Sequence, residues 1–152
     1  MARVLLTGMS GTGKTTVLGE LRRRGHLTVD TDYNAWVLPD RTWDRPRMDE
    51  LLAAHPAVVV SGTVENQGEF YDRFEHVVLL SAPVDVLLDR VRRRTENPYG
   101  RTAEQRAEIE EYVETVEPLL RAGSTLELDA RRPVGDLADA IEKLVAPGRP
   151  PR

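Results

Sequence analysis

The sequence predicts a three-layer α/β fold, in which helices cover both faces of a parallel sheet. Short apolar runs alternate with longer helix-like stretches along the 152-residue chain, and this alternation is typical of strand–helix–strand units. The apolar runs are short and nearly unbroken, as expected of strands buried on both faces. A glycine-rich segment also joins the first apolar run to the first helix-like stretch, so the first strand–loop–helix unit is recognisable from its sequence alone.

We expect five strands and five helices in alternating order. The predicted strands lie near residues 2–7, 27–30, 57–61, 76–80 and 125–129. The predicted helices cover about residues 14–24, 46–54, 83–91, 102–117 and 134–145. Pro46 and Pro83 fit the first turns of their helices, and Thr102 with Gln105 matches a capping box. Pro118 is expected to kink or end the fourth helix.

The composition argues against several classes of protein. A chain with 40% hydrophobic and 30% charged residues is ordinary for a soluble globular domain. Its net charge of −4 argues against general nucleic-acid binding, and no apolar run approaches the ~20 residues of a membrane span. The absence of cysteine excludes disulfides and thiolate metal sites. We therefore expect a cytoplasmic protein without nucleic-acid or membrane partners, as a monomer or a homodimer.

Residues 8–15 read G-x-x-x-x-G-K-T, which is the phosphate-binding P-loop pattern. Glycines let the backbone amides turn inward around a β-phosphate, and the following helix adds its positive end. Lys14 then supplies a charge for the β- and γ-phosphates, and the Thr15 hydroxyl ligates Mg²⁺. The predicted nucleotide contacts from this segment are Gly8, Ser10, Gly11, Thr12, Gly13, Lys14, Thr15 and Thr16. The expected architecture is therefore the P-loop NTPase form of the three-layer α/β fold.

Two aspartates, Asp30 and Asp32, come at the end of the second predicted strand. Ligands of open parallel sheets bind beyond the carboxyl ends of the strands, so both carboxylates should lie near the P-loop. Residues two apart on an extended segment face the same side. We assign Asp30 to a Mg²⁺-bound water and Asp32 to the proton of an attacking hydroxyl. The alternative is an aspartate-rich turn or helix cap, which the neighbouring P-loop makes the weaker interpretation.

Arginines are concentrated between residues 90 and 101. A triphosphate that loses its γ-phosphoryl group needs cations around its developing charge, and a loop that closes over the site also excludes water. Arg94 and Arg101 are the candidates for this role. Arg90 has the alternative of being an ordinary solvated helix residue.

These segments resemble the shikimate-kinase-like and nucleoside-monophosphate-kinase-like P-loop kinases. Residues 8–16 are similar to the phosphate loop of that group, and residues 29–32 to the segment that positions magnesium water and the acceptor hydroxyl. Residues 128–133 resemble the loop that packs against adenine, which implies nucleotide contacts from Arg132 and Pro133 and ATP as the nucleotide.

The resemblance covers nearly the whole chain. It implies a single P-loop kinase domain over residues 1–145, with a mobile lid at about residues 94–102. Residues 146–152 are rich in proline and are expected to form a flexible tail.

The predicted acceptor region departs from the shikimate-kinase pattern. The glycine-rich motif after the third strand is reduced to Gly62, and Glu65 adds a carboxylate there. Arg45 and Arg47 are candidates for one clamp of an acceptor carboxylate, but residues 108–117, where a second clamp is expected, are acidic and lack arginine. Repulsion there favours a neutral or cationic acceptor over shikimate, unless these glutamates form a solvated face. Trp36 either lines an apolar acceptor wall or packs a helix onto the sheet.

The sequence therefore predicts an enzyme, a P-loop phosphotransferase with an alcohol group as acceptor. It would move the γ-phosphoryl group of Mg-ATP to a small molecule with Lys14, Asp32, Arg94 and Arg101 as its catalytic residues. One alternative is a nucleoside monophosphate kinase. The only plausible set for the phosphate of such an acceptor is Arg41, Arg45 and Arg47. A second alternative is a switch protein that hydrolyses ATP slowly and acts by changing shape.

Overall fold

The computed structural model describes residues 1–95 and 97–147. Within this part of the chain, five strands form one parallel sheet in the order β2-β3-β1-β4-β5. The strands are β1 (Arg3–Gly8), β2 (Thr28–Asp30), β3 (Val58–Ser61), β4 (His76–Ser81) and β5 (Leu126–Asp129). Every predicted strand is confirmed to within one residue at each end. Residue 96 of the predicted lid and residues 148–152 of the predicted tail lie outside the described residues.

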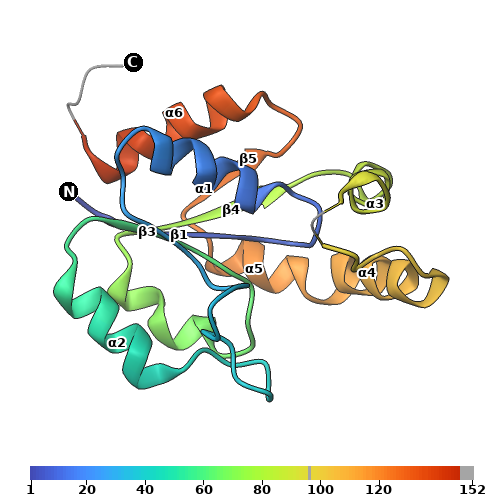
Figure 1. Cartoon of the computed structure of the whole chain (residues 1–152), viewed down its shortest axis with the longest axis horizontal. Coiled ribbons are helices and arrows are strands. Elements are labelled where there is room, and N and C mark those ends of the chain that lie inside the picture. The colour runs from blue at the N-terminus through green and yellow to red at the C-terminus, as the bar shows by residue number, and fades with distance from the viewer. Residues whose placement is uncertain (96, 148–152) are drawn as a thin grey trace.

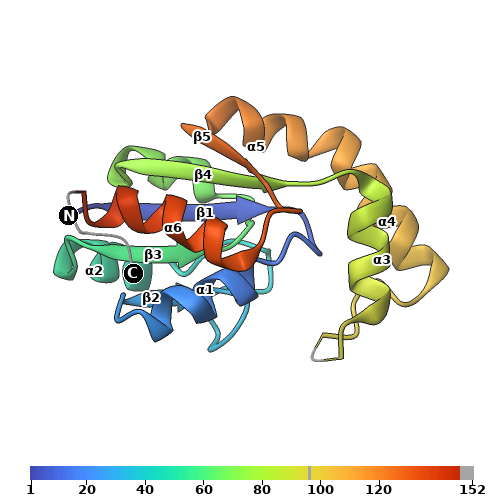
Figure 2. The same cartoon turned by 90° about the horizontal axis from the view of Figure 1, so that it is seen from above.

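Helices lie on both faces of the sheet and beyond one of its ends, which confirms the three-layer α/β prediction (Figure 1, Figure 2). On one face, α1 (Lys14–Arg23) and α6 (Val134–Val145) lie side by side. The opposite face carries α2 (Arg45–Ala54), the 3₁₀ helix η1 (Gln67–Arg73) and α5 (Glu117–Gly123). The remaining two helices, α3 (Val84–Arg93) and α4 (Ala103–Thr115), extend beyond the carboxyl ends of the strands (Figure 2).

Alternating side chains of the central strand divide the core between the two faces. Val4 and Leu6 belong to the cluster packed against α1 and α6. Leu5, which points the other way, belongs to a cluster with residues of α2 and η1. A third cluster joins Met9, directly after β1, to Leu87 of α3. Packing in this cluster therefore places α3, the helix that precedes the predicted lid, against the P-loop.

The helix limits follow the signals in the sequence. The Thr102 hydroxyl accepts a hydrogen bond from the Gln105 amide at 3.1 Å, and the Gln105 side chain accepts one from the Thr102 amide at 3.5 Å, so the predicted capping box is confirmed. The predicted break also occurs, since α4 ends at Thr115 and Pro118 lies in the first turn of α5. No helix in the described parts of the chain is long and apolar enough to cross a membrane.

Candidate active site

The P-loop, the end of β2 and the start of the lid surround a cavity of about 500 Å³ at the carboxyl ends of the strands. Most of the predicted nucleotide contacts line it. These are Ser10, Gly11, Thr12, Gly13, Lys14, Thr15, Thr16, Arg94 and Arg132. Gly8 and Pro133 are not among the lining residues. Pro133 lies between the lining residues Arg132 and Val134, and Gly8 lies two residues before Ser10. Asp32 lines the same cavity, so the fold joins the P-loop to one of the two predicted carboxylates.

Two loop glycines are required by close backbone approach. A Cβ on Gly8 would lie 2.4 Å from the Leu80 carbonyl oxygen of β4. A Cβ on Gly11 would lie 2.8 Å from the Leu87 carbonyl oxygen of α3, and Gly11 has a φ of +92°, a conformation that side chains disfavour. The loop therefore keeps its shape by packing against β4 and α3, and not only by its own turns.

Lys14 is held against the first residues of the loop. Its Nζ donates to the Gly8 carbonyl oxygen at 2.7 Å and to the Met9 carbonyl oxygen at 3.2 Å. Burial lowers the pKa of Lys14 below its ordinary value, against the opposing attraction of Asp32 and Asp30. The ammonium is thus a poorly hydrated cation at the floor of the cavity, and an anionic ligand would stabilise its charged form.

The residues predicted to serve Mg²⁺ lie together. The Thr15 hydroxyl donates to Asp30 Oδ2 at 2.7 Å. Asp30 is the register partner of Ser61 on β3, and the buried Ser61 hydroxyl has no hydrogen-bond partner in the described structure. Oxygen ligands of this kind suit Mg²⁺, which proteins usually bind through one or two carboxylates and substrate phosphates. The described residues contain no group of three or more His, Cys, Asp or Glu side chains able to hold a metal, so phosphate oxygens would have to complete the ligand set.

Asp32 lies at the mouth of the cavity, and its amide donates to Asp30 Oδ1 at 3.1 Å. Asp32 is an exposed residue, yet enough protein lies around its carboxylate that desolvation raises its pKa above the ordinary aspartate value. Lys14 and Arg94 act in the opposite direction, and repulsion from Asp30 adds to the rise. A carboxylate with a raised pKa is a stronger base than an ordinary aspartate, as a proton acceptor needs to be.

The two lid arginines are placed differently. Arg94 is half-buried, and its Nη2 donates to Ser10 Oγ at 3.1 Å and to the Tyr99 carbonyl oxygen at 2.8 Å. Arg101 is exposed, and its Nη2 donates to the Arg94 carbonyl oxygen at 2.6 Å. Only Arg94 therefore reaches the P-loop, while the contact of Arg101 with a phosphate stays a prediction.

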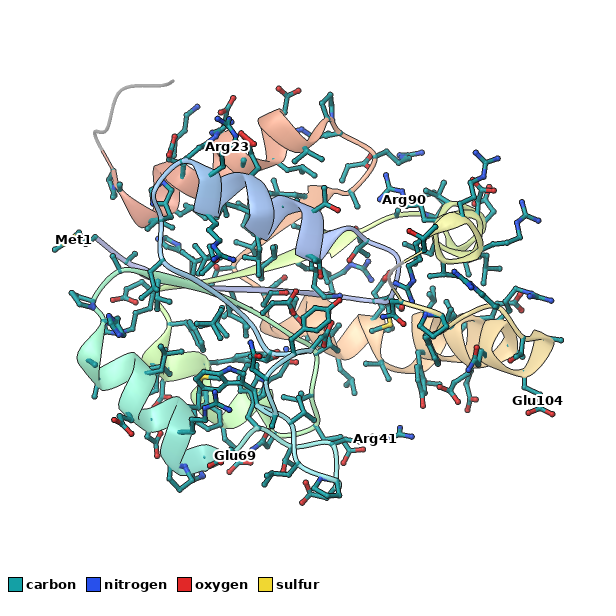
Figure 3. All side chains as sticks on the ribbon, viewed as in Figure 1. Met1, Arg23, Arg41, Glu69, Arg90 and Glu104 are labelled. Carbon is teal, nitrogen blue, oxygen red and sulfur yellow. The ribbon has the colours of Figure 1, made fainter. Side chains whose placement is uncertain are left out.

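Arg90 belongs to the site, although the sequence left a solvated role open for it. Its Nη2 donates to the Ala130 carbonyl oxygen at 2.8 Å, and its Nη1 to the carbonyl oxygens of Gly11 and Thr12 at 3.4 and 3.3 Å. Figure 3 shows it on the side of α3 that faces the start of α1. The signal was its spacing, because Arg90 follows the buried Leu87 by three residues within α3 and so shares its helix face.

Gly62 follows β3, and its small size serves a contact within the protein. A Cβ there would lie 2.1 Å from the Thr31 hydroxyl oxygen and 3.3 Å from the Trp43 ring. Thr31 Oγ1 donates to the Ser61 carbonyl oxygen at 2.8 Å and accepts from Trp43 Nε1 at 3.0 Å. These hydrogen bonds join the loop between β2 and α2, which carries Thr31 and Trp43, to the end of β3. The contact lies next to Asp32 in the same loop.

The other predicted acceptor residues do not line the cavity. Trp36 is buried in the core cluster under α2, and the Arg47 guanidinium lies 3.9 Å from the centre of its ring. Arg47 Nη1 also donates to the Asn34 carbonyl oxygen at 2.6 Å. Glu65 is exposed. The observed contacts correspond to the packing alternative for Trp36, and acceptor binding by these residues stays a prediction.

A second polar group joins the loop after β2 to α4. Arg41 Nη1 donates to the Tyr112 hydroxyl at 3.2 Å, and the Tyr99 hydroxyl is hydrogen-bonded to Glu108. Burial and this carboxylate raise the pKa of Tyr99. Arg41 also has a φ of +66°, which is uncommon for a residue with a side chain and often marks a functional loop. The sequence missed this group because it comes from three separate segments.

A family model described as an AAA domain matches residues 4–111. The chain belongs to the AAA domain family. The matched segment begins in β1 and ends in α4, so it includes the P-loop, both aspartates and the lid arginines.

Among curated proteins, the chain is similar to the dephospho-CoA kinase of Deinococcus radiodurans, with 41% identity over 68 residues. The match covers 43% of this chain and spans 30% of that relative's length. It is therefore a likeness to part of that protein.

Solved structures resemble the fold over nearly its whole length. The shikimate kinase from Acinetobacter baumannii, in complex with shikimate, has a TM-score of 0.76 and 23% identity, and the match covers 95% of this chain and 93% of that one. For the gluconokinase from Sinorhizobium meliloti 1021 the TM-score is 0.60 and the identity 20%, with 90% and 86% covered. At these identities the likeness is one of fold, and it confirms the predicted resemblance in fold to shikimate-kinase-like proteins.

Proposed function

We propose that this protein is an ATP-dependent small-molecule kinase, which transfers the γ-phosphoryl group of Mg-ATP to a hydroxyl group. The observation that carries the proposal is the placement of Asp32 in one cavity with the P-loop, Lys14 and Arg94. A protein that only binds ATP does not need a second carboxylate in this cavity, whereas transfer to a hydroxyl needs a group that accepts its proton. Asp32 also has a raised pKa, which suits a proton acceptor.

In the proposed reaction, the acceptor oxygen forms a bond to the γ-phosphorus while the bond from that phosphorus to the bridging oxygen of ADP breaks. The hydroxyl proton passes to Asp32. Lys14 and Arg94 neutralise charge on the transferred group. Thr15, and Asp30 by way of water, would hold Mg²⁺, which would supply positive charge to the phosphates. Within the proposed domain (residues 1–145), the lid (residues 94–102) would close over both substrates and exclude water.

We propose ATP rather than GTP as the nucleotide. The support is the position of Arg132, which lines the cavity beside Val134 at the start of α6. This is the place at which the kinases that the sequence resembles hold adenine. Pro133, between these two residues, would contribute by holding the loop in shape.

We further propose that the acceptor is neutral or cationic and is not shikimate. The two arginines of α2 that are candidates for binding a carboxylate already have partners, Arg45 in Glu69 and Arg47 in the Trp36 ring. Arg41 remains, and Glu108 and Glu65 lie close enough to attract its charge. The partners of Arg45 and Arg47 also weaken the nucleoside monophosphate kinase alternative, because Arg41, Arg45 and Arg47 are the set that would bind the acceptor phosphate.

The experiment that tests this function measures ATP consumption over a pooled library of metabolites, sorted into acidic, neutral and cationic acceptors. We expect one neutral or cationic compound to stimulate turnover and the Asp32→Asn variant to lose that stimulation. Stimulation only by acidic compounds would contradict the acceptor class. Slow ATP loss that no acceptor and no Asp32 substitution changes would contradict the kinase and support the switch protein.

A further inference from the structure

The cavity runs across the carboxyl edge of the sheet, from one outer strand to the other. Ala130 and Arg132, which line it, follow β5. Asp32 and Tyr33 line it as well, and they follow β2. These two strands are the outer strands of the sheet, and the P-loop follows the central strand β1 between them (Figure 2). A nucleotide that extends from the loop after β5 to the P-loop, as proposed, therefore leaves the β2 end of the cavity for the acceptor.

Tyr33 exposes a large aromatic side chain at this end of the cavity. Its exposed fraction is 47%. Among the exposed large hydrophobic side chains of the described residues, Tyr33 and Val134 are the two that line the cavity, and Val134 lies at the opposite end, where α6 begins. The cavity thus has an apolar surface at each end and the P-loop between them. Apolar and aromatic linings of this kind suit ligands that present an apolar face.

The backbone around Tyr33 keeps this residue at the cavity and takes the next residues away from it. The Tyr33 amide donates to the Asp30 carbonyl oxygen at 3.2 Å. Asn34 and Ala35 then have φ values of +64° and +59°, which are uncommon for residues with side chains. Trp36 follows and is buried in the core. The chain therefore turns directly after Tyr33, which is the last residue of this loop to line the cavity.

Tyr33 differs from the other predicted acceptor residues because its side chain is not committed to contacts within the protein. Its hydroxyl makes no hydrogen bond to the part of the chain that the structure describes, whereas Trp36 and Arg47 are stacked on each other. Burial lowers the pKa of Arg94, and Asp32 and Tyr33 oppose that shift. The Tyr33 side chain is therefore close to both groups that are proposed to act on the transferred phosphoryl group.

We propose that Tyr33 is a specificity-determining residue for the acceptor, and that it selects a ring by stacking against it. A tyrosine ring is a flat apolar surface, and ring stacking adds to the gain from burial. The acceptor would be a cyclic alcohol, with its reacting hydroxyl on the ring or on a carbon attached to the ring. This inference rests on the proposed kinase function and deepens it, because ring contact takes the place of a charged clamp as the basis of selection.

The test sorts the acceptor library into three arms, which are aromatic-ring alcohols, saturated-ring alcohols and acyclic alcohols. We expect a ring compound to stimulate wild-type ATP turnover, and its arm identifies the kind of ring. For that compound, Tyr33→Ala should raise KM by about 5- to 50-fold. The value of kcat should change by less than about 3-fold, because stacking stabilises the ground state and the transition state alike. Tyr33→Phe keeps the ring and should keep KM within about 2-fold.

Tyr33→Leu separates ring stacking from simple apolar contact, because leucine is apolar but not flat. We expect its KM to lie between those of wild type and Tyr33→Ala, and a wild-type KM would overturn the role of the ring. Leu38→Ala is the matched control and should keep the wild-type KM. Leu38 is an exposed hydrophobic residue of the same loop, at 41% exposure, and it does not line the cavity.

Titration calorimetry of ATP completes the test. The dissociation constant of ATP should be the same for Tyr33→Ala and wild type, and weaker binding in the variant would overturn the inference by assigning the ring to the nucleotide. An acyclic acceptor, or an unchanged KM in Tyr33→Ala, would overturn the role of Tyr33 and leave the kinase function intact. If no arm of the library stimulates turnover, the kinase function itself is overturned, and this inference with it.

Discussion

The P-loop side of the cavity and the region proposed for the acceptor, here called the nucleotide side and the acceptor side, are built in different ways. The nucleotide side comes mostly from one continuous segment, residues 8–16, and its glycines pack directly on β4 and α3. The acceptor side is assembled from the loop after β2, the loop after β3, the lid and α4. The geometry of a motif in one segment is set largely by neighbouring residues, whereas side chains from four segments come together only after the fold has formed.

The same difference appears in how the charged groups are used. On the nucleotide side, Lys14, Arg90 and Arg94 bind backbone or hydroxyl oxygens of the P-loop and form no ion pair with the residues that the structure describes. On the acceptor side, Arg45 is paired with a carboxylate and Arg47 is stacked on a tryptophan. Cations held by neutral oxygens remain available to an anionic ligand, so the nucleotide side is prepared for phosphate while most of the acceptor side is committed to internal contacts.

The largest effect is expected for Asp32→Asn, because Asp32 lies where the nucleotide side and the acceptor side meet. If Asp32 is the proton acceptor, kcat should fall by about 10²- to 10⁴-fold, while the dissociation constant of ATP stays nearly unchanged. The measurement is acceptor-stimulated ATP turnover beside calorimetric ATP binding. Retained turnover would remove Asp32 from the chemistry.

The wild-type pH profile supplies the control for that result. The folded chain raises the pKa of Asp32, and the basic form is the active one, so kcat/KM should fall as the pH drops through a value above the ordinary aspartate pKa of about 4. Any residual activity of Asp32→Asn should lack this acid limb.

A second prediction concerns the two lid arginines. Arg94→Ala removes a guanidinium that touches Ser10 of the P-loop and should lower kcat by about 10²- to 10³-fold, as expected for a lost donor to transition-state charge. Arg101→Ala is the matched control from the same lid. Its guanidinium is exposed and bonds a lid carbonyl, so we expect a much smaller loss. Equal losses would show that both arginines contact the transferred group.

Gly62→Ala tests the rigidity of the acceptor side. The added methyl group would meet the Thr31 hydroxyl, so we expect a destabilisation of about 1–3 kcal/mol, seen as a lower melting temperature. Gly68→Ala is its control, since no heavy atom lies within 4 Å of a Cβ there. If both variants melt like the wild type, the contact between Thr31 and Gly62 is not a constraint on the fold.

The smallest predicted effect is on stability. Folding raises the pKa of Asp32, so the folded state favours its neutral form. The stabilisation from that form is complete below the unfolded pKa of about 4 and is lost as the pH rises through the folded pKa. Nucleotide-free Asp32→Asn should therefore melt slightly higher than wild type at neutral pH, and the gap should narrow in acid. A lower melting temperature at neutral pH would contradict the direction of the shift.

The strands, the P-loop and the helix limits could be predicted from the sequence because they depend on neighbouring residues. Apolar runs marked all five strands of the described structure, and the Thr102 capping box needs only residues 102–105. The sequence also predicts that Thr15 and Asp30 both serve Mg²⁺, because ligands of an open parallel sheet bind beyond the carboxyl ends of its strands, and the structure places the two side chains in hydrogen-bond contact.

The tertiary structure decided which members of similar groups reach the site. Arg90 and Arg92 are near neighbours, yet Arg90 binds the P-loop and Arg92 pairs with Asp89 on the solvent side. Gly62 is small because of Thr31, which lies about 30 residues earlier in the sequence. Thr63 meets Gly8 because β3 pairs with β1. The identity of a residue is local, whereas its partner is set by the packing of distant segments, and that packing is what the sequence pattern does not contain.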